Sequence, residues 1–171
     1  MKKYISIIIF FLTFVINAQE KSIFDIARSG SLDEMKLAYK TKPESINQTN
    51  ENGSSTLILA SYRGNIEVAK FLIANVKDLN YNSGMGTALM GAVYKNQLEL
   101  VKLLLENKAN PNLVDANGAT ALILAAQTGN VEMIKLLLQF KADKTVKTKD
   151  GKTAFEIAAF AGNENIINAL K

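Results

Sequence analysis

The sequence predicts an all-α fold, a solenoid of about five helix-turn-helix repeats joined by short β-turn or hairpin loops. One observation is the segment 115–147, which reads as a turn, a short apolar helix, a glycine break and a second, amphipathic helix. A second observation is that this pattern recurs along the chain at a spacing of about 33 residues. The third is size: one such pair of helices cannot bury both apolar faces, so it needs copies on either side.

The segment 115–147 carries start and stop signals for its first helix. Thr120 is placed to cap that helix through its hydroxyl group. Gly129 stands where a left-handed residue would end the helix. The second helix is expected to turn one apolar stripe toward the core, formed by Val131, Ile134 and Leu138, with Met133 and Leu137 beside it.

The other repeats carry the same signals at matching positions. The cap position holds Ser55, Thr87, Thr120 and Thr153, the small core position holds Ala60, Ala92, Ala125 and Ala158, and the stop position holds Gly64, Asn96, Gly129 and Gly162. A weaker copy precedes them, with Ile23, Ala27 and Gly30. Because the cap, core and stop positions recur together in each repeat, the repeat pattern is specific.

These slots resemble the ankyrin repeat family, whose consensus is a turn, a Thr-Pro-Leu-His-x-Ala-Ala helix, a glycine and a second helix ending in Leu-Leu. The resemblance covers about residues 21–171. The family's proline and histidine are replaced throughout, for example by Ala121 and Ile123. The glycine that follows the family's second helix is replaced by Val76, Lys108 and Lys141. Because these residues disfavour positive φ, the family's loop geometry is not expected there.

The first segment, Met1–Ala18, is predicted to be a signal peptide. Lys2 and Lys3 precede an apolar run, 5–16, of about 12 residues, whereas a membrane-spanning helix needs roughly 20. Ala18 offers a small residue for cleavage. The predicted mature chain is 19–171, and we expect it in the periplasm or outside the cell; an uncleaved membrane anchor is the alternative.

The repeats are placed, in chain order, at about 21–48, 49–81, 82–114, 115–147 and 148–171. In the first, Ser22 is expected to cap a helix at 23–29, and Pro43 to lie in a connection where helix cannot continue. The inner second helices each carry a glutamate followed three residues later by a lysine, expected to form solvated pairs: Glu67/Lys70, Glu99/Lys102 and Glu132/Lys135. The closing second helix is expected at about 164–170.

The amino-acid composition excludes the residue types that most often carry catalysis and metal binding. The chain has no cysteine and no histidine, which removes disulfides, thiolate chemistry and the commonest general base. Without Lys2 and Lys3 the net charge falls from +4 to +2, too balanced to indicate nucleic acid. We therefore predict no catalytic, cofactor-binding or metal-binding residue, no cofactor, and no membrane span after signal cleavage.

The remaining candidate is a protein-binding surface. In the ankyrin family, partners usually bind the concave face, formed by the turn tips and the exposed side of each first helix. Carried over by position, the candidate partner-binding residues are Arg28, Tyr62, Arg63, Tyr94, Lys95, Gln127 and Phe160. Tyrosine and arginine are enriched in binding hot spots. The alternative is ordinary soluble surface with half-buried tyrosine rings.

The sequence thus favours a monomeric, non-enzymatic module that recognises a protein partner through its concave face. Two further functions stay open. One is an inhibitor or immunity protein that neutralises a toxin or hydrolase, and the other is an enzyme or enzyme subunit.

Overall fold

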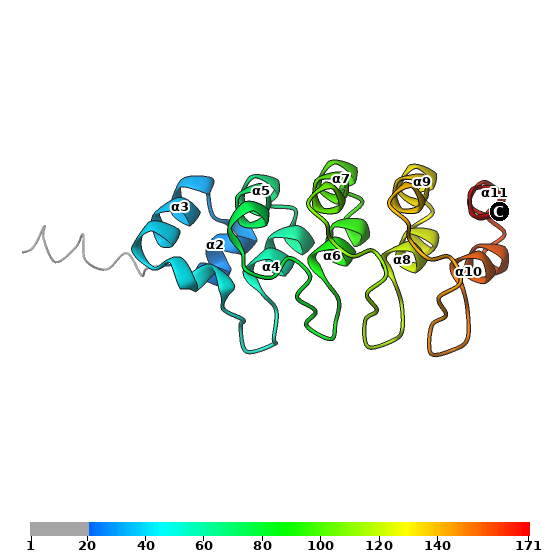
Figure 1. The fold of residues 1–171 in the computed structure, drawn as a ribbon, viewed down its shortest axis with the longest axis horizontal. Coiled ribbons are helices and arrows are strands. Elements are labelled where there is room, and N and C mark those ends of the chain that lie inside the picture. The colour runs from blue at the N-terminus through cyan, green and yellow to red at the C-terminus, as the bar shows by residue number, and fades with distance from the viewer. Residues whose placement is uncertain (1–20) are drawn as a thin grey trace, which may run out of the picture.

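The computed structural model describes residues 21–171, which form ten α-helices and one 3-10 helix and contain no strand. The signal peptide predicted at Met1–Ala18 lies outside the described residues. Figure 1 shows the helices as antiparallel pairs lined up along one axis, with long loops projecting from one side of the row. The predicted helical solenoid is confirmed.

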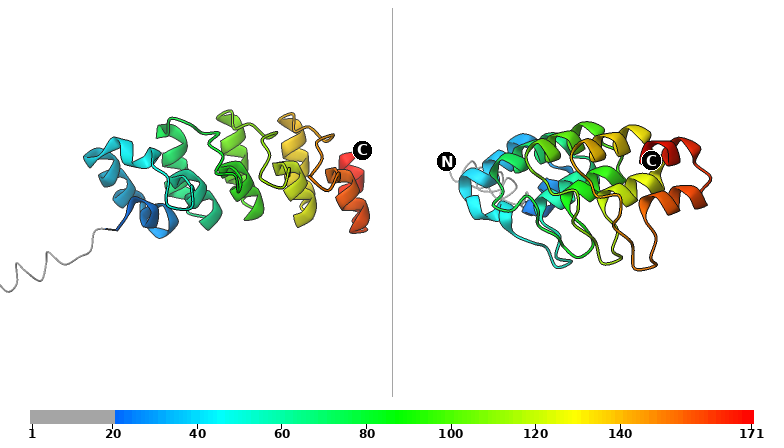
Figure 2. Two further views of the ribbon diagram at one scale, coloured as in Figure 1. Left: turned by 90° about the horizontal axis from the view of Figure 1, so that it is seen from below. Right: turned by 45° about the vertical axis from the view of Figure 1, so that its right-hand side comes forward.

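Each repeat contributes a first and a second helix. The first helices are α2 (Ile23–Ser29), α4 (Thr56–Arg63), α6 (Ala88–Tyr94), α8 (Ala121–Thr128) and α10 (Ala154–Phe160). The second helices are α3 (Leu32–Thr41), α5 (Ile66–Asn75), α7 (Leu98–Glu106), α9 (Val131–Gln139) and α11 (Glu164–Leu170). Each first helix packs against the next first helix, and Figure 2 shows the two rows that result.

The start of every first helix follows from one hydroxyl group. Ser22, Ser55, Thr87, Thr120 and Thr153 each accept a hydrogen bond from the backbone N–H three residues further on. This bond satisfies an N–H that has no partner inside the helix. The predicted caps are confirmed, and they fix the register of each repeat.

The predicted stop position is left-handed in four repeats and extended in one. Gly64, Asn96, Gly129 and Gly162 all have positive φ, 57° at Asn96 and 77° at Gly129. Gly30, by contrast, is extended at φ −78°. A Cβ at Gly30 would lie 2.6 Å from the Cα atom of Ile26, so glycine is needed there for close packing. Asparagine tolerates the left-handed region better than other residues, which explains Asn96.

The core runs through all five repeats as a strip of small and aliphatic side chains. The small residues that align with Ala125, namely Ala60, Ala92 and Ala158, are fully buried where first helices meet. In α9 the buried residues are Met133, Ile134 and Leu137, while Val131 and Leu138 are only half-buried. The buried stripe is therefore rotated from the predicted one, because α9 packs against both neighbouring second helices and against α8.

The loop after the second helix was predicted wrongly in two of three repeats. Lys108 and Lys141 adopt positive φ, 70° and 63°, as a glycine would. Of the three residues, Val76 alone avoids the left-handed conformation, as expected, with φ −72°. Its β-branched side chain disfavours the left-handed region more strongly than an unbranched lysine does. Pro43 also differs from a plain connection, because it begins a 3-10 helix, η1 (Pro43–Asn47).

The ion pairs on the second helices also differ from those predicted. Of the three expected pairs, the described residues form only Glu67/Lys70, at 3.3 Å. Lys70 also reaches Glu99 of the next repeat at 2.8 Å, which leaves Lys102 to approach Glu106 at 3.8 Å. The shorter contact thus links two repeats instead of bracing one helix.

Four projecting loops, which we call the finger loops, connect successive repeats at 49–55, 82–86, 115–119 and 148–152. Each is closed by its own backbone hydrogen bond, such as the bond from Asp115 N–H to the Ala119 carbonyl at 3.0 Å. Neighbouring fingers are also joined, by Ala116 N–H to the Gly84 carbonyl at 2.7 Å. The first helices lie on the same side of the row as these loops (Figure 1).

Candidate partner-binding surface

The structure brings two predicted residues into direct contact. The rings of Tyr62 and Tyr94, at the ends of α4 and α6, stack at a centroid separation of 5.4 Å and an interplanar angle of 14°. The two residues are 42% and 54% exposed. Successive repeats place the same slot side by side, and this is what brings the rings together. We call them the tyrosine pair.

One predicted cation lies over this pair. The Nζ atom of Lys95 is 5.3 Å from the centroid of the Tyr62 ring and 6.0 Å from that of Tyr94. A cation within about 6 Å of an aromatic face is attracted to the ring quadrupole. The tyrosine pair therefore presents apolar faces and a positive charge together, a combination that suits an apolar group beside an acidic one.

Arg63 does not join the tyrosine pair. It is exposed, and within residues 21–171 it makes no ion pair or ring contact. The difference arises at the helix ends. Arg63 is the last residue of α4, whereas α6 ends one residue earlier and Lys95 is its cap, with φ −84° and ψ 2°. Of the two cations predicted to lie beside the two tyrosine rings, Lys95 does so and Arg63 does not.

The other candidate residues stand apart from the tyrosine pair. Arg28 forms an ion pair with Asp25 at 3.0 Å within α2. Hydrogen bonds from Ser22 and Arg28 lower the pKa of Asp25 below its ordinary value. Phe160 is 87% exposed, and the Nζ atom of Lys152 lies 5.1 Å from its ring centroid. Gln127 is exposed and separates this second aromatic site from the tyrosine pair.

An apolar pocket of about 390 Å³ adjoins the tyrosine pair, and the sequence interpretation missed it. Its lining includes Leu59, Gly91 and Leu124, at equivalent positions of three successive first helices. The signal was available in the sequence, since Gly91 replaces the leucine of both neighbours. Glycine inside a helix is less stable than alanine by about 1 kcal/mol, so this replacement needs a compensating role.

A metal centre requires a cluster of ligands, and a membrane span requires a long apolar helix. No group of three or more acidic residues is placed to hold a metal ion within residues 21–171. Among the same residues, no helix combines the length and apolar character that crossing a membrane requires.

A row of antiparallel helix pairs defines the class of helical repeat proteins. The family model described as "Ankyrin repeats (3 copies)" matches residues 23–115 and 89–171, and the chain belongs to the ankyrin repeat family. Ankyrin repeats indicate a protein–protein interaction module.

Two relatives share part of the sequence. The chain is 40% identical over 100 residues to "Ankyrin repeat and SAM domain-containing protein 6" of Rattus norvegicus, and 30% identical over 100 residues to the protein of the same name in Mus musculus. Each match covers 57% of this chain but spans only 11% of the length of the relative. The likeness thus concerns the repeats.

Proposed function

We propose that this protein is an exported, monomeric, non-enzymatic module that holds a protein partner against its concave face. The tyrosine pair carries the proposal. Two large exposed rings are held rigid by stacking, and Lys95 lies over them. Tyrosine is among the residues most enriched in hot spots, because it supplies contact area at little cost in conformational entropy.

Affinity capture tests this function. The purified protein, immobilised through an added C-terminal tag, is incubated with periplasmic extract, and retained proteins are identified by mass spectrometry. A matched column carries the Tyr62→Ala, Tyr94→Ala variant. A protein retained by the wild type and not by the variant supports the proposal. Equal retention by both columns contradicts it.

Export rests on the Lys2-Lys3 start and the short apolar run before Ala18. The mature protein is then expected to begin at or near Gln19. Intact mass of the material recovered from the periplasm measures this directly, and a mass that still includes Met1 overturns the proposed cleavage.

Once a partner has been captured, its own activity can distinguish between the possible roles of this protein. Addition of the purified protein to the partner's own activity assay distinguishes inhibition, as expected of an immunity protein, from simple scaffolding. A scaffold leaves the partner's activity unchanged at saturation.

A further inference from the structure

The pocket beside the tyrosine pair exists because one side chain is missing. Leu59 of α4 and Leu124 of α8 occupy a slot in which α6 has Gly91. All three residues line the pocket, so it lies where a third leucine would otherwise fill the row. Its volume of about 390 Å³ falls within the usual range for ligand sites, roughly 300–1,000 Å³.

Gly91 also accounts for the tyrosine pair. A Cβ atom at this position would lie 3.2 Å from the backbone nitrogen of Tyr62 and 3.5 Å from its Cα and Cβ atoms. The absence of a side chain therefore lets α6 approach α4 closely. One glycine thus opens the pocket and allows the stacking of the rings at its edge.

Two methionines line the pocket and differ in their exposure. Met90 is buried on α6, while Met85, in the finger loop before it, is 87% exposed. The loop is held by Ser83, whose Oγ accepts a hydrogen bond from Met85 N–H at 3.3 Å and donates one to the Gly86 carbonyl at 3.2 Å. Methionine side chains adapt their shape to an apolar partner. Hydrogen bonds brace the loop backbone, while the exposed side chain of Met85 can adjust.

Negative charge lines the pocket at one residue, and positive charge lies at its edge. Asp115 contributes the single carboxylate of the lining, and it accepts hydrogen bonds from Asn117 N–H at 2.8 Å and Ala119 N–H at 2.9 Å within its own finger loop. Lys95 lies over the tyrosine rings at the edge. A complementary ligand therefore combines an apolar group with negative charge.

We propose that this pocket takes a bulky apolar side chain of the partner, flanked in the partner's sequence by acidic residues that approach Lys95. This inference rests on the proposed function and names the chemistry of the segment that is recognised. It predicts that short acidic peptides with one aromatic residue bind here without the rest of the partner.

Methyl NMR of the purified protein tests the proposal, because the methionines report from inside and outside the pocket. Met85 and Met90 line it, whereas Met35 and Met133 are fully buried elsewhere. With methyl-¹³C-methionine labelling, the protein is titrated with three capped peptides: Gly-Asp-Phe-Asp-Gly, Gly-Asp-Ala-Asp-Gly and Gly-Lys-Phe-Lys-Gly. Decanoate, a small anionic amphiphile, is the fourth probe.

The expected result is that the Asp-Phe-Asp peptide shifts the methyl signals of Met85 and Met90 and leaves those of Met35 and Met133 in place. Its affinity should exceed that of the Ala and Lys peptides by about tenfold or more. Equal shifts from the Lys peptide overturn the acidic part of the proposal. Absence of shifts with every peptide, or tighter binding of decanoate than of any peptide, overturns the proposal as a whole.

Two substitutions at Met85 that differ only in charge provide the second test. Because Met85 is largely exposed, Met85→Glu and Met85→Gln should fold alike. Met85→Glu should weaken binding of the Asp-Phe-Asp peptide several-fold relative to Met85→Gln. If the two bind equally, the proposal fails. If the captured partner depends on the tyrosine pair but binds both Met85 variants equally, the proposed function stands and the pocket assignment alone is wrong.

Discussion

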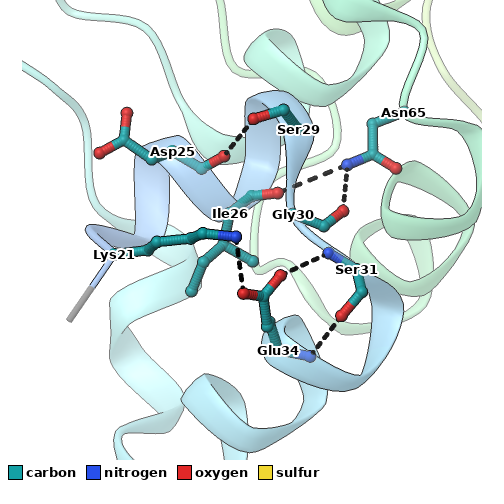
Figure 3. Close-up of polar contacts among 8 residues, drawn as sticks. All are labelled: Lys21, Asp25, Ile26, Ser29, Gly30, Ser31, Glu34 and Asn65. Atoms are coloured by element: carbon teal, nitrogen blue, oxygen red, sulfur yellow. Dashed lines mark hydrogen bonds and ion pairs between the residues drawn. The ribbon is translucent and has the colours of Figure 1, made fainter. Parts of the chain in front are cut away.

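The side-chain nitrogen of Asn65 lies 2.9 Å from the carbonyl oxygen of Gly30, in the preceding repeat. Figure 3 shows the same amide turned toward the Ile26 carbonyl, and a third contact reaches the Ala27 carbonyl at 3.3 Å. The last carbonyls of a helix have no partner inside it. Asn65 reaches the Ala27 carbonyl of α2 and the Gly30 carbonyl that follows it, whereas the Ile26 carbonyl also accepts a hydrogen bond from Gly30 N–H at 2.8 Å. The Asn65 amide thus joins the first repeat to the second.

Asn65→Ala should therefore destabilise the protein by about 1–3 kcal/mol, because it leaves partly buried carbonyl groups unsatisfied. Urea unfolding followed by circular dichroism measures the change. Asn75→Ala is the matched control, since the Asn75 amide donates to the Phe71 carbonyl of its own helix, at 2.7 Å, and reaches no other repeat within residues 21–171. Equal losses from the two substitutions would contradict the role assigned to Asn65.

Two kinds of feature could be predicted from the sequence: helix caps, which depend on local chemistry, and contacts between equivalent positions of successive repeats. A hydroxyl group at a helix start is enough to place the cap at Thr120, and the repeat period is enough to bring Tyr62 next to Tyr94. The pocket was missed because it depends on a side chain that is absent, that of Gly91, together with residues from three finger loops. The Asn65 contact was missed because it joins positions that are not equivalent in the repeat, since Gly30 aligns with Gly64.

Lys141 and Lys108 depart from the rule that residues with a side chain avoid positive φ. Both adopt the left-handed conformation that the ankyrin consensus assigns to glycine. Lys141→Gly should therefore raise stability by about 0.5–1 kcal/mol, because relief of an unfavourable φ outweighs the added entropy of the unfolded chain. Val76→Gly is the control and should lower stability, since Val76 has an extended backbone. A loss at both positions in thermal unfolding would contradict this account.

Packing between repeats should tolerate no increase in size at Ala125. This residue is fully buried in α8, between α6 and α10. Ala125→Leu should overpack the interface and lower the unfolding free energy by about 1–3 kcal/mol. Gly129→Val should also destabilise, because a β-branched residue resists φ near 77°. Thermal melts of both variants that match the wild type would show that the repeat register is wrong.

Stability should fall in acid and stay nearly constant near neutrality. A hydrogen bond from Lys21, with help from Ser31, lowers the pKa of Glu34, and the Thr153 backbone N–H lowers that of Glu156. Since these carboxyl groups are less readily protonated when folded, their contribution is present above the ordinary glutamate pKa of about 4.3 and is lost as pH falls through the folded value. With no histidine, little should titrate between about pH 6 and 8.

Urea unfolding at a series of pH values measures this dependence. The Glu34→Gln, Glu156→Gln variant removes both titrating groups, so its unfolding free energy should change less between about pH 5 and 3 than that of the wild type. An identical decline in the variant would assign the acid sensitivity to other carboxylates.

The tyrosine pair should matter for binding and not for folding. Tyr62→Ala with Tyr94→Ala removes two exposed rings and leaves the buried core intact. The melting temperature should change little, while affinity for the captured partner should fall by about 2 kcal/mol or more if these rings are the hot spot. Lys95→Glu should mainly slow association, and its effect should shrink in high salt. Surface plasmon resonance separates the two rate constants.

The control for this experiment must lie on the second helices without disturbing the fold. Lys70 is unsuitable, because it bridges Glu67 and Glu99. Lys102→Ala with Lys135→Ala is preferable: Lys102 makes one weak contact at 3.8 Å, and Lys135 is exposed. These substitutions should leave both rate constants nearly unchanged. If they abolish binding while the alanine pair at Tyr62 and Tyr94 does not, the partner uses the second-helix face, and the assignment to the concave face is wrong.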